Sequence, residues 1–345
     1  MLENKKANIS VIIPTFNEEK DVEACLNAVF NNDFGNEFIE VIIIDGGSKD
    51  KTIEIVESFK NYQRNIKVIV KINSSVYEAL NVGLNEAKGE YVVRVDARSL
   101  IPTNYISKCI ANLSEYHAMV AGGVQEQYGK DIYQRTIAEV LKSTFGTGGA
   151  KFRQGGFSGY VDTVYLGVFK KKTFDAVGKY DDDGIVISED SMMNDRISKI
   201  GGKIYLDGGL KVQYPAKRSI RELFKQYFIY GGAKAHTFLK YKRLTAFRQY
   251  GILFACLMSM ITLLLTLAGV ISFIFPAFFV ALYAILVLSS STFLSIESKN
   301  SISFLYSICI YPTIHFGWVM GFLARFIFGK SLAPYFFTSK KKINE

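Results

Sequence analysis

Three short stretches of the sequence place polar and acidic side chains directly after apolar, β-branched runs. They are residues 14–18, 45–50 and 96–99. Carboxylates, amides and hydroxyls at such positions can exchange hydrogen bonds with a polar ligand, and adjacent glycines such as Gly46 and Gly47 let a ligand approach the backbone. Glu189 and Asp190 form a separate pair of neighbouring carboxylates, a residue type suited to proton transfer.

The elements that must position these residues follow from the alternation of apolar runs with helix-like segments. Strands are expected at residues 9–13, 40–44, 66–70 and 91–95, and helices at residues 19–31, 51–61 and 75–87. Strands that alternate with crossover helices form a parallel sheet covered on both faces. Because ligands bind outside the carboxyl ends of such strands, we expect an α/β fold in which the polar stretches share one edge.

Two motifs resemble the opening of family 2 glycosyltransferases: VIIPTFNEEK from Val11 to Lys20, and VIIIDGGSKDKT from Val41 to Thr52. Each motif alone is an ordinary strand and turn, but together, about thirty residues apart, they favour the family. The resemblance implies a GT-A nucleotide-sugar-binding fold with a mixed, mostly parallel sheet, followed by transmembrane helices. It also implies that a nucleotide sugar is bound by Pro14, Thr15, Asn17, Glu18, Asp45 and Gly47.

The resemblance continues from Ala79 to Asp96, adds Asn81 to the implied nucleotide-sugar site, and leads to the family's Asp-x-Asp motif. Here that motif reads Asp96-Ala97-Arg98. The family's last Asp helps to hold a divalent cation against the diphosphate, whereas a protonated guanidinium cannot ligate a metal. Either Asp96 and other groups hold the cation, or Arg98 itself offsets part of the diphosphate charge. An Mg or Mn ion with Asp96 as ligand is the expected cofactor.

The run ISEDSMMNDR, residues 187–196, resembles the family's Glu-Asp motif with its following Arg. Inverting transfer needs a base that removes the proton of the attacking acceptor hydroxyl. The resemblance implies that Asp190 is this base, that Glu189 lies beside it, and that Arg196 contacts the acceptor. Acidic residues also favour the first turn of any helix, so this motif depends on the upstream ones for its interpretation.

Residues 212–232 resemble the corresponding stretch of the succinoglycan-type branch of the family. Apolar residues at helical spacing beside basic ones indicate an amphipathic helix at a membrane surface, with core packing as the alternative. Such a helix could hold the diphosphate of a lipid-linked acceptor through Arg218 and Arg221, with Gln226 beside it.

The last third of the chain predicts membrane helices. The 48 residues between Arg248 and Glu297 contain no Asp, Glu, Lys, Arg or His, which is enough for two spans. A third apolar segment, residues 302–328, contains Pro312, His315 and Arg325, so spanning, re-entrant and interfacial placements stay open. Basic residues before the first span and at the C-terminus favour a cytoplasmic location for both, which an odd number of spans cannot satisfy. They are Lys240, Lys242, Arg243, Arg248, Lys340, Lys341 and Lys342.

Composition excludes several classes of function. The net charge of +9 flanks apolar segments instead of forming one basic face, which argues against nucleic-acid binding. Four cysteines without paired spacing indicate neither a disulfide framework nor a metal site. The glycine-rich residues 146–159 predict a flexible loop instead of regular helix.

We expect four parts: a cytoplasmic GT-A domain (residues 1–215), an amphipathic interfacial segment (216–248), a membrane segment of two or three helices (249–330) and a basic tail (331–345). The expected protein is a multi-pass enzyme of the cell membrane. It would move a hexose from a nucleotide diphosphate sugar, expected to be UDP-linked, to a polyprenyl-diphosphate-linked oligosaccharide of an exopolysaccharide or capsule. The alternatives are a polyprenyl-phosphate monosaccharide transferase and a catalytically inactive membrane-bound scaffold.

Overall fold

The computed structural model describes residues 8–35, 38–60, 65–180, 189–242, 244 and 248–329. The chain separates into two compact units. The first comprises Met1–Gln127 and Lys151–Pro215, and the second comprises Tyr128–Ala150 and Ala216–Glu345. Residues 128–150, which lie inside the expected GT-A domain in sequence, therefore pack with the C-terminal helices.

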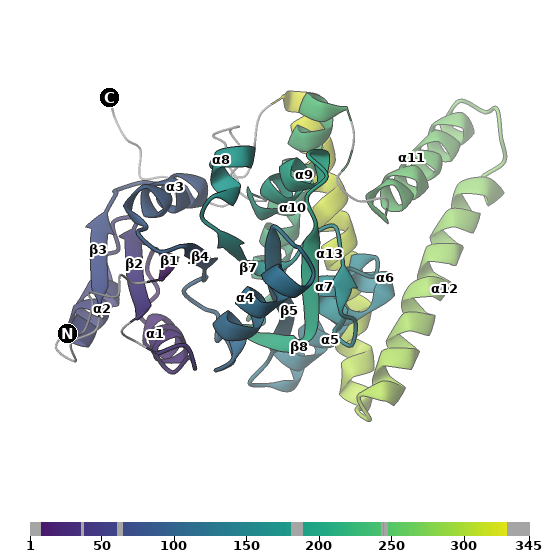
Figure 1. The fold of residues 1–345 in the computed structure, drawn as a ribbon. Coiled ribbons are helices and arrows are strands. Elements are labelled where there is room, and N and C mark those ends of the chain that lie inside the picture. Colours follow the sequence, from purple (N-terminus) through teal and green to yellow (C-terminus); the bar gives the residue numbers. More distant parts are fainter. Residues whose placement is uncertain are drawn as a thin grey trace, which may run out of the picture. The chain divides into compact units, whose positions relative to one another are not determined.

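An eight-stranded sheet forms the centre of the first unit, with strand order β3-β2-β1-β4-β7-β5-β8-β6 (Figure 1). Its parallel half, β3-β2-β1-β4, confirms the strands expected from the sequence, and β7 joins antiparallel to both β4 and β5. The fold is therefore the mixed α/β sheet that the sequence predicts. The strands are β1 Ile9–Thr15, β2 Ile39–Asp45, β3 Ile66–Val70, β4 Tyr91–Arg94, β5 Val120–Tyr128, β6 Gly159–Tyr160, β7 Tyr165–Lys170 and β8 Ile204–Pro215.

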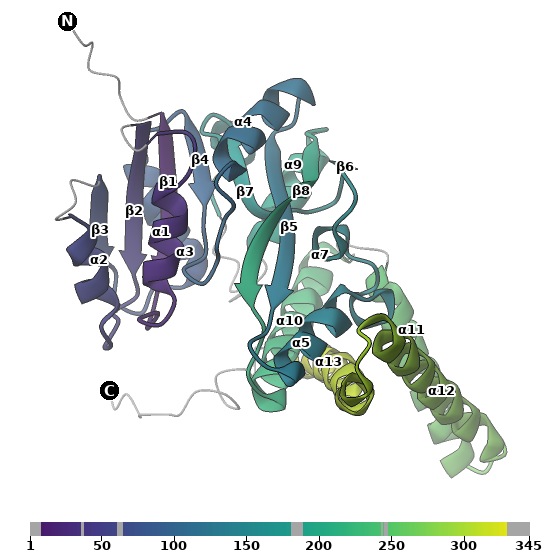
Figure 2. The ribbon, with the colours of Figure 1, turned by 90° about the horizontal axis from the view of Figure 1, so that it is seen from below.

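Helices cover both faces of this sheet, because side chains alternate between the faces along each strand. Val11 and Ile13 share one buried cluster with Leu26 of α1 (Val22–Phe30), and α2 (Thr52–Lys60) and α4 (Tyr105–Glu115) contribute to the same cluster. Ile12 points to the opposite face and packs with α3 (Val76–Glu86), α8 (Thr173–Val177) and α9 (Glu189–Lys199). Figure 2 shows α1 and α3 on the two sides of β1.

The second unit consists of helices: α5 Ile132–Lys142, α6 Thr144–Thr147, α10 Ile220–Tyr241, α11 Arg248–Leu267, α12 Ile274–Glu297 and α13 Ser301–Phe328. Within the described residues, α11, α12 and α13 are long and apolar enough to cross a membrane. Buried residues make up 6% of the apolar window of α11 and 17% of that of α12, against 44% in α13. The third apolar segment is thus a continuous helix, and the most buried of the three.

The amphipathic segment predicted before the first span forms α10, which packs closely along α13. A Cβ atom on Gly231 would lie 1.8 Å from the carbonyl oxygen of Trp318, and one on Gly321 would lie 1.9 Å from that of Phe228. Only glycine allows the two backbones to approach this closely. One face of α10 therefore packs against α13 with backbone directly against backbone.

The loop prediction for residues 146–159 is wrong in part. The helix α7 (Lys151–Gln154) lies inside this stretch, and α6 ends within it. The glycines around α7 nevertheless have positive φ angles, as at Gly149 and Gly155, so the stretch turns sharply before and after the short helix.

Candidate active site

Two loops at the carboxyl ends of β1 and β2, residues 15–18 and 45–50, are joined by hydrogen bonds, and we call them the end loops. Asn17 has a positive φ of 55°, and its backbone N–H donates to Ser48 Oγ at 2.8 Å. The Asn17 side-chain oxygen accepts the Lys49 N–H at 2.8 Å. The backbone N–H of Glu18 donates to Thr52 Oγ1 at 2.7 Å. The end loops thus form one structured surface at the edge of the sheet.

Asp45 is the centre of this surface. Its buried carboxylate accepts hydrogen bonds from Thr15 Oγ1 at 3.0 Å, from the Gly47 N–H at 2.9 Å, and from the Ser48 N–H and Oγ at 2.7 and 2.6 Å. Gly47 has a φ of 92°, which favours glycine. All partners of Asp45 here are neutral donors, and Pro14 precedes Thr15 in the same strand. The structure therefore brings together Pro14, Thr15, Asn17, Glu18, Asp45 and Gly47 as the sequence predicts.

Exposed apolar side chains flank the two glycines of the second end loop. Phe16 is 57% exposed and lies 3.3 Å from the Cβ position of Gly46, and Ile72 is 72% exposed and lies 3.5 Å from that of Gly47. A flat ligand could pack against Phe16 and Ile72 while hydrogen bonding to the end loops. Neither Phe16 nor Ile72 is among the residues predicted from the sequence, although Phe16 lies inside the first motif.

A second group of charged residues surrounds Arg94, the last residue of β4, and we call Arg94, Asp96, Glu189 and Asp190 the acid cluster. Arg94 Nε and Nη2 each lie 3.0 Å from Asp96 Oδ1. Arg94 Nη1 lies 2.7 Å from Glu189 Oε1 and forms a further short contact with Asp190 Oδ1. One guanidinium therefore holds three carboxylates that come from two separate parts of the chain.

The alternation of side chains along β4 explains this arrangement. Val93 and Val95 point to the face that carries α1 and α4, whereas Val92 points to the face that carries α9. Arg94 is two residues after Val92 and so faces α9, whose first turn contains Glu189 and Asp190. The α9 dipole also favours carboxylates at this end.

Three carboxylates around one guanidinium leave an excess of negative charge in the acid cluster. Burial raises the pKa of Asp190 to about 7; the positive charge of Arg94 opposes this rise, and the negative charges of Glu189 and Asp96 add to it. The side chain of Asp190 is still 30% exposed, so a substrate can reach it. A carboxylate whose pKa lies near neutrality is suited to act as a general base.

Arg98 is separate from the acid cluster and pairs with Glu18, its Nε lying 2.7 Å from Glu18 Oε2. Hydrogen bonding to Glu18 raises the pKa of Arg98, which therefore stays charged. At 39% exposure of its side chain, Arg98 is accessible to an anionic ligand. The structure thus brings Arg98 to the end loops, beside the first motif.

The described residues contain no group of three or more His, Cys, Asp or Glu side chains that could hold a metal ion. Asp96, 29% exposed, is the carboxylate at the position expected for a ligand, and its Oδ2 accepts a hydrogen bond from Tyr165 Oη at 3.2 Å. Mg²⁺ often takes one or two protein carboxylates and completes its shell with substrate phosphates and water. Asp96 fits the role of a single protein ligand in such a shell.

Two predicted residues are engaged by backbone groups elsewhere in the first unit. Asn81 donates to the Tyr180 carbonyl at 2.6 Å and accepts from the Tyr180 N–H at 2.9 Å. Arg196 Nη2 donates to the Lys179 carbonyl at 2.5 Å. Asn81 and Arg196 thus fix the segment before residue 181, and their predicted ligand contacts stay predictions.

Three further predicted residues belong to the second unit. Arg218 and Arg221 are exposed around the start of α10, and Gln226 Nε2 donates to Tyr230 Oη at 2.8 Å. Ser219 caps this helix through a hydrogen bond from the Glu222 N–H. Their role in acceptor binding stays a prediction.

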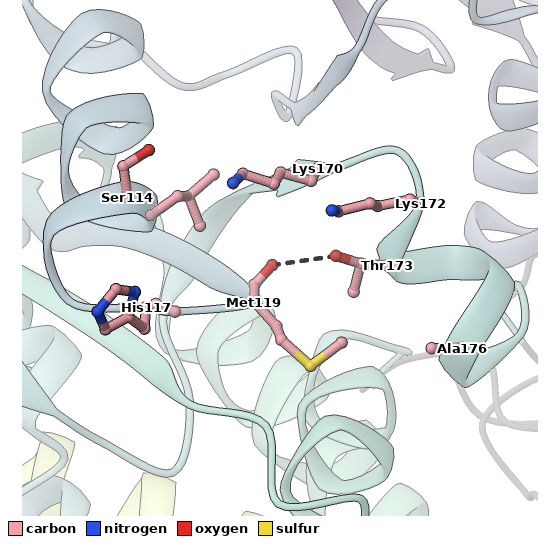
Figure 3. Close-up of a pocket in the computed structure, with 9 residues that line it drawn as sticks. Ser114, His117, Met119, Lys170, Lys172, Thr173 and Ala176 are labelled. Carbon is pink, nitrogen blue, oxygen red and sulfur yellow. Dashed lines mark hydrogen bonds between the residues drawn. The ribbon is translucent and has the colours of Figure 1, made fainter.

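A cavity of about 530 Å³ lies at a different place in the first unit (Figure 3). Lys170 lines this cavity and pairs with Tyr91, the first residue of β4. Asp96 comes after Arg94, the last residue of β4, so the cavity and Asp96 lie at opposite ends of this strand. The other lining residues are Leu113, Ser114, His117, Ala118, Met119, Lys172, Thr173 and Ala176. None of the predicted site residues lines this cavity.

The comparisons with known proteins bear on the family and the fold. Residues 10–178 match the sequence profile described as Glycosyl transferase family 2. A dolichyl N-acetyl-alpha-D-glucosaminyl phosphate 3-beta-D-2,3-diacetamido-2,3-dideoxy-beta-D-glucuronosyltransferase of Methanococcus voltae is 29% identical over 271 residues, covering 74% of this chain and 82% of the relative. The succinoglycan biosynthesis protein ExoA of Rhizobium meliloti is 26% identical over 241 residues, covering 69% of this chain and 72% of the relative.

A solved structure shows the same fold over nearly the whole chain. The mannosyltransferase PcManGT from Pyrobaculum calidifontis, in complex with GDP-Man and Mn²⁺, has a TM-score of 0.63 at 16% identity and covers 94% of this chain and 88% of its own. At this identity the likeness supports the GT-A fold and no detail of the site.

Proposed function

Since the chain belongs to glycosyl transferase family 2, we propose that it moves a hexose from a nucleotide diphosphate sugar to a polyprenyl-diphosphate-linked oligosaccharide. The observation that supports this most is the acid cluster. In it, Asp190 of α9, a carboxylate of raised pKa, is paired with Arg94 at the end of β4, in the sheet whose strands β1 and β2 lead to the end loops.

The donor's nucleobase would bind at the end loops. Asp45 holds the end loops in place through its four hydrogen bonds, and Phe16 and Ile72 offer apolar surface to the ring of the base. We expect a uridine diphosphate sugar, by the family resemblance. Arg98 pairs with Glu18 of the first end loop, and its side chain is 39% exposed. We propose that Arg98 contacts the diphosphate of the donor.

A divalent ion would be held by Asp96 together with the diphosphate of the donor. When bound, Mg or Mn would supply positive charge against the departing diphosphate. Arg98 supplies positive charge of the same kind without a metal, and it occupies the place in the motif where the family has its second carboxylate. We therefore propose a cation requirement that Arg98 weakens.

Asp190 would act as the general base. Its carboxylate removes the proton from the acceptor hydroxyl, whose oxygen forms the new bond to the anomeric carbon as the bond to the diphosphate oxygen breaks. The nucleoside diphosphate leaves from the opposite face, which inverts the anomeric configuration. Arg94 contacts Asp190 through Oδ1, so Oδ2 can receive the proton.

The acceptor would be lipid-linked, because the second unit combines basic side chains with apolar helices. Arg218 and Arg221 are exposed cations around the start of α10, in the unit whose α11, α12 and α13 can cross a membrane. We propose that they hold the acceptor's diphosphate, with Gln226 as a further contact on α10. Arg196 of α9 is proposed separately as an acceptor contact. The relative from Methanococcus voltae is named for transfer to a lipid-linked N-acetylglucosamine.

The protein would reside in the cell membrane as a multi-pass protein with its catalytic unit in the cytoplasm. Lys240 and Lys242 precede α11, and basic residues near a span favour the cytoplasmic side. An exopolysaccharide or capsule pathway is the proposed context, since the relative from Rhizobium meliloti is named for succinoglycan biosynthesis.

One experiment distinguishes the proposed acceptor from polyprenyl phosphate, the alternative. Membranes containing the protein are incubated with radiolabelled UDP- and GDP-sugars and with either native lipid-linked oligosaccharide or polyprenyl phosphate. We expect label in the organic phase with the oligosaccharide acceptor and at least one UDP-sugar. Label with polyprenyl phosphate alone would favour the alternative, and no label with any pair would contradict the proposed function.

A further inference from the structure

Arg94 is a buried arginine within the stretch from Ala79 to Asp96 that resembles the family. Its side chain is 8% exposed, and all of its contacts within the acid cluster are charged. Its neighbours along the chain, Val92, Val93 and Val95, are apolar and buried. A buried ion pair is weak support for stability, because an apolar residue of similar volume often serves as well or better. The presence of Arg94 in β4 therefore calls for a reason other than stability.

The geometry of the contacts supplies such a reason. The guanidinium presents Nε and Nη2 to Asp96 on one side and Nη1 to Glu189 and Asp190 on the other. Because the guanidinium is planar and its donors point in fixed directions, it sets the positions of its partners more strictly than a lysine ammonium would. Asp96 and Asp190, which are 94 positions apart in the sequence, are thereby tied to one rigid group.

We propose that Arg94 is a positioning residue for sugar transfer: its guanidinium holds the base Asp190 at a fixed place relative to Asp96, the residue next to the donor's diphosphate. This inference rests on the proposed function and extends it to a residue that touches neither the sugar nor the diphosphate. In-line attack needs the acceptor hydroxyl, the anomeric carbon and the leaving oxygen in register, and small misplacements of the base cost much of the rate.

Other charged and titratable groups face the same place and must be controlled for. Glu189 shares Nη1 with Asp190, Tyr180 lies close to both Arg94 and Asp190, and Tyr105 of α4 is also close enough to interact with Asp190. The variants below leave all three unchanged, so differences between them report on Arg94 and Asp190.

The test is a double-mutant cycle with Arg94→Lys, Arg94→Met, Asp190→Asn and the two combined variants, assayed for transfer and for donor binding. We expect Arg94→Lys and Arg94→Met each to lower kcat by about 30-fold or more. Donor Kd and acceptor KM should stay within about fivefold, since the guanidinium touches neither substrate. In the Asp190→Asn background the same changes should cost less than about threefold, because the base they position is already lost.

Arg135→Met serves as the matched control, because Arg135 is an exposed arginine on α5 outside the site, and it should leave transfer unchanged. If Arg94 only supplies charge, Arg94→Lys will restore transfer and overturn the proposal. Equal losses with and without Asp190 would do the same. Loss of donor binding by both Arg94 variants would show that Arg94 builds the fold of the site instead of positioning the base. If the unmodified protein transfers no sugar, the proposed function fails instead.

Discussion

The end loops and the acid cluster both include residues at the carboxyl ends of parallel strands, but their carboxylates have opposite surroundings. In the end loops, Asp45 is surrounded by backbone N–H groups and hydroxyls, all of them neutral donors. In the acid cluster, Asp96, Glu189 and Asp190 surround one guanidinium. Hydrogen bonds from neutral donors hold Asp45 in place within the proposed donor site. Burial and the neighbouring carboxylates instead raise the pKa of Asp190, the carboxylate that is to exchange a proton.

This difference predicts two separable kinds of defect. Changes in the acid cluster should reduce the chemical step and leave donor binding nearly intact. Changes in the end loops should weaken donor binding. Arg98 pairs with the end-loop residue Glu18 and comes four residues after Arg94. Changes at Arg98 should therefore affect both donor binding and the chemical step.

The largest effect is expected for Asp190→Asn. The amide keeps the size of the side chain but cannot take a proton, and general-base assistance contributes roughly 10² to 10⁴ in rate. Transfer should fall at least ~100-fold, while donor binding stays within about threefold. Both are measured on one membrane preparation. Near-normal transfer by this variant would remove Asp190 as the base.

The pH dependence of transfer should reflect the same residue. Because the pKa of Asp190 is raised to about 7, its base form is lost as the pH falls through this value. Transfer at low substrate concentration should therefore fall about tenfold per pH unit below pH 7 and level off above it. Asp190→Asn should abolish this limb. An acid limb centred near pH 4 would contradict the raised pKa.

Asp45→Ala should affect binding instead. Losing a charge-assisted hydrogen bond of ~1.5–3 kcal/mol should raise the donor Kd about tenfold or more. The defect in transfer should be overcome by raising the donor concentration, unlike that of Asp190→Asn. Nucleotide titration of the two variants side by side gives the comparison directly. An unchanged Kd would exclude Asp45 from the donor site.

The smallest effect on transfer is expected from removing the metal ion with a chelator. Because the Asp96-Ala97-Arg98 motif offers one carboxylate and one guanidinium, chelation should lower transfer only in part, and Arg98→Asp should make transfer more dependent on added Mg²⁺ or Mn²⁺. A chelator titration of both proteins measures this. If chelator stops the unmodified protein completely and Arg98→Asp changes nothing, Arg98 does not replace part of the ion.

Much of the first unit could be predicted because its signals are local. Strand runs such as 9–13 and 40–44 need only β-branched residues bounded by turn residues, and the structure extends them by a residue or two as β1 and β2. The polar residues after them met at one edge because parallel strands align their carboxyl ends. Local signals could not predict that residues 128–150 belong to the second unit, because this depends on their packing with α13.

Local patterning in the sequence was enough to predict the family, the parallel half of the sheet, the polar residues of the end loops and the apolar helices. It could not place Arg94, which reads as one polar residue at the end of an apolar strand and gains its role only from α9, about a hundred positions later. It also could not show that α10 fits against α13, since the close approach at Gly231 and Gly321 involves two distant segments. Local periodicity encodes elements, whereas charge pairing and backbone contact arise only when those elements meet in space.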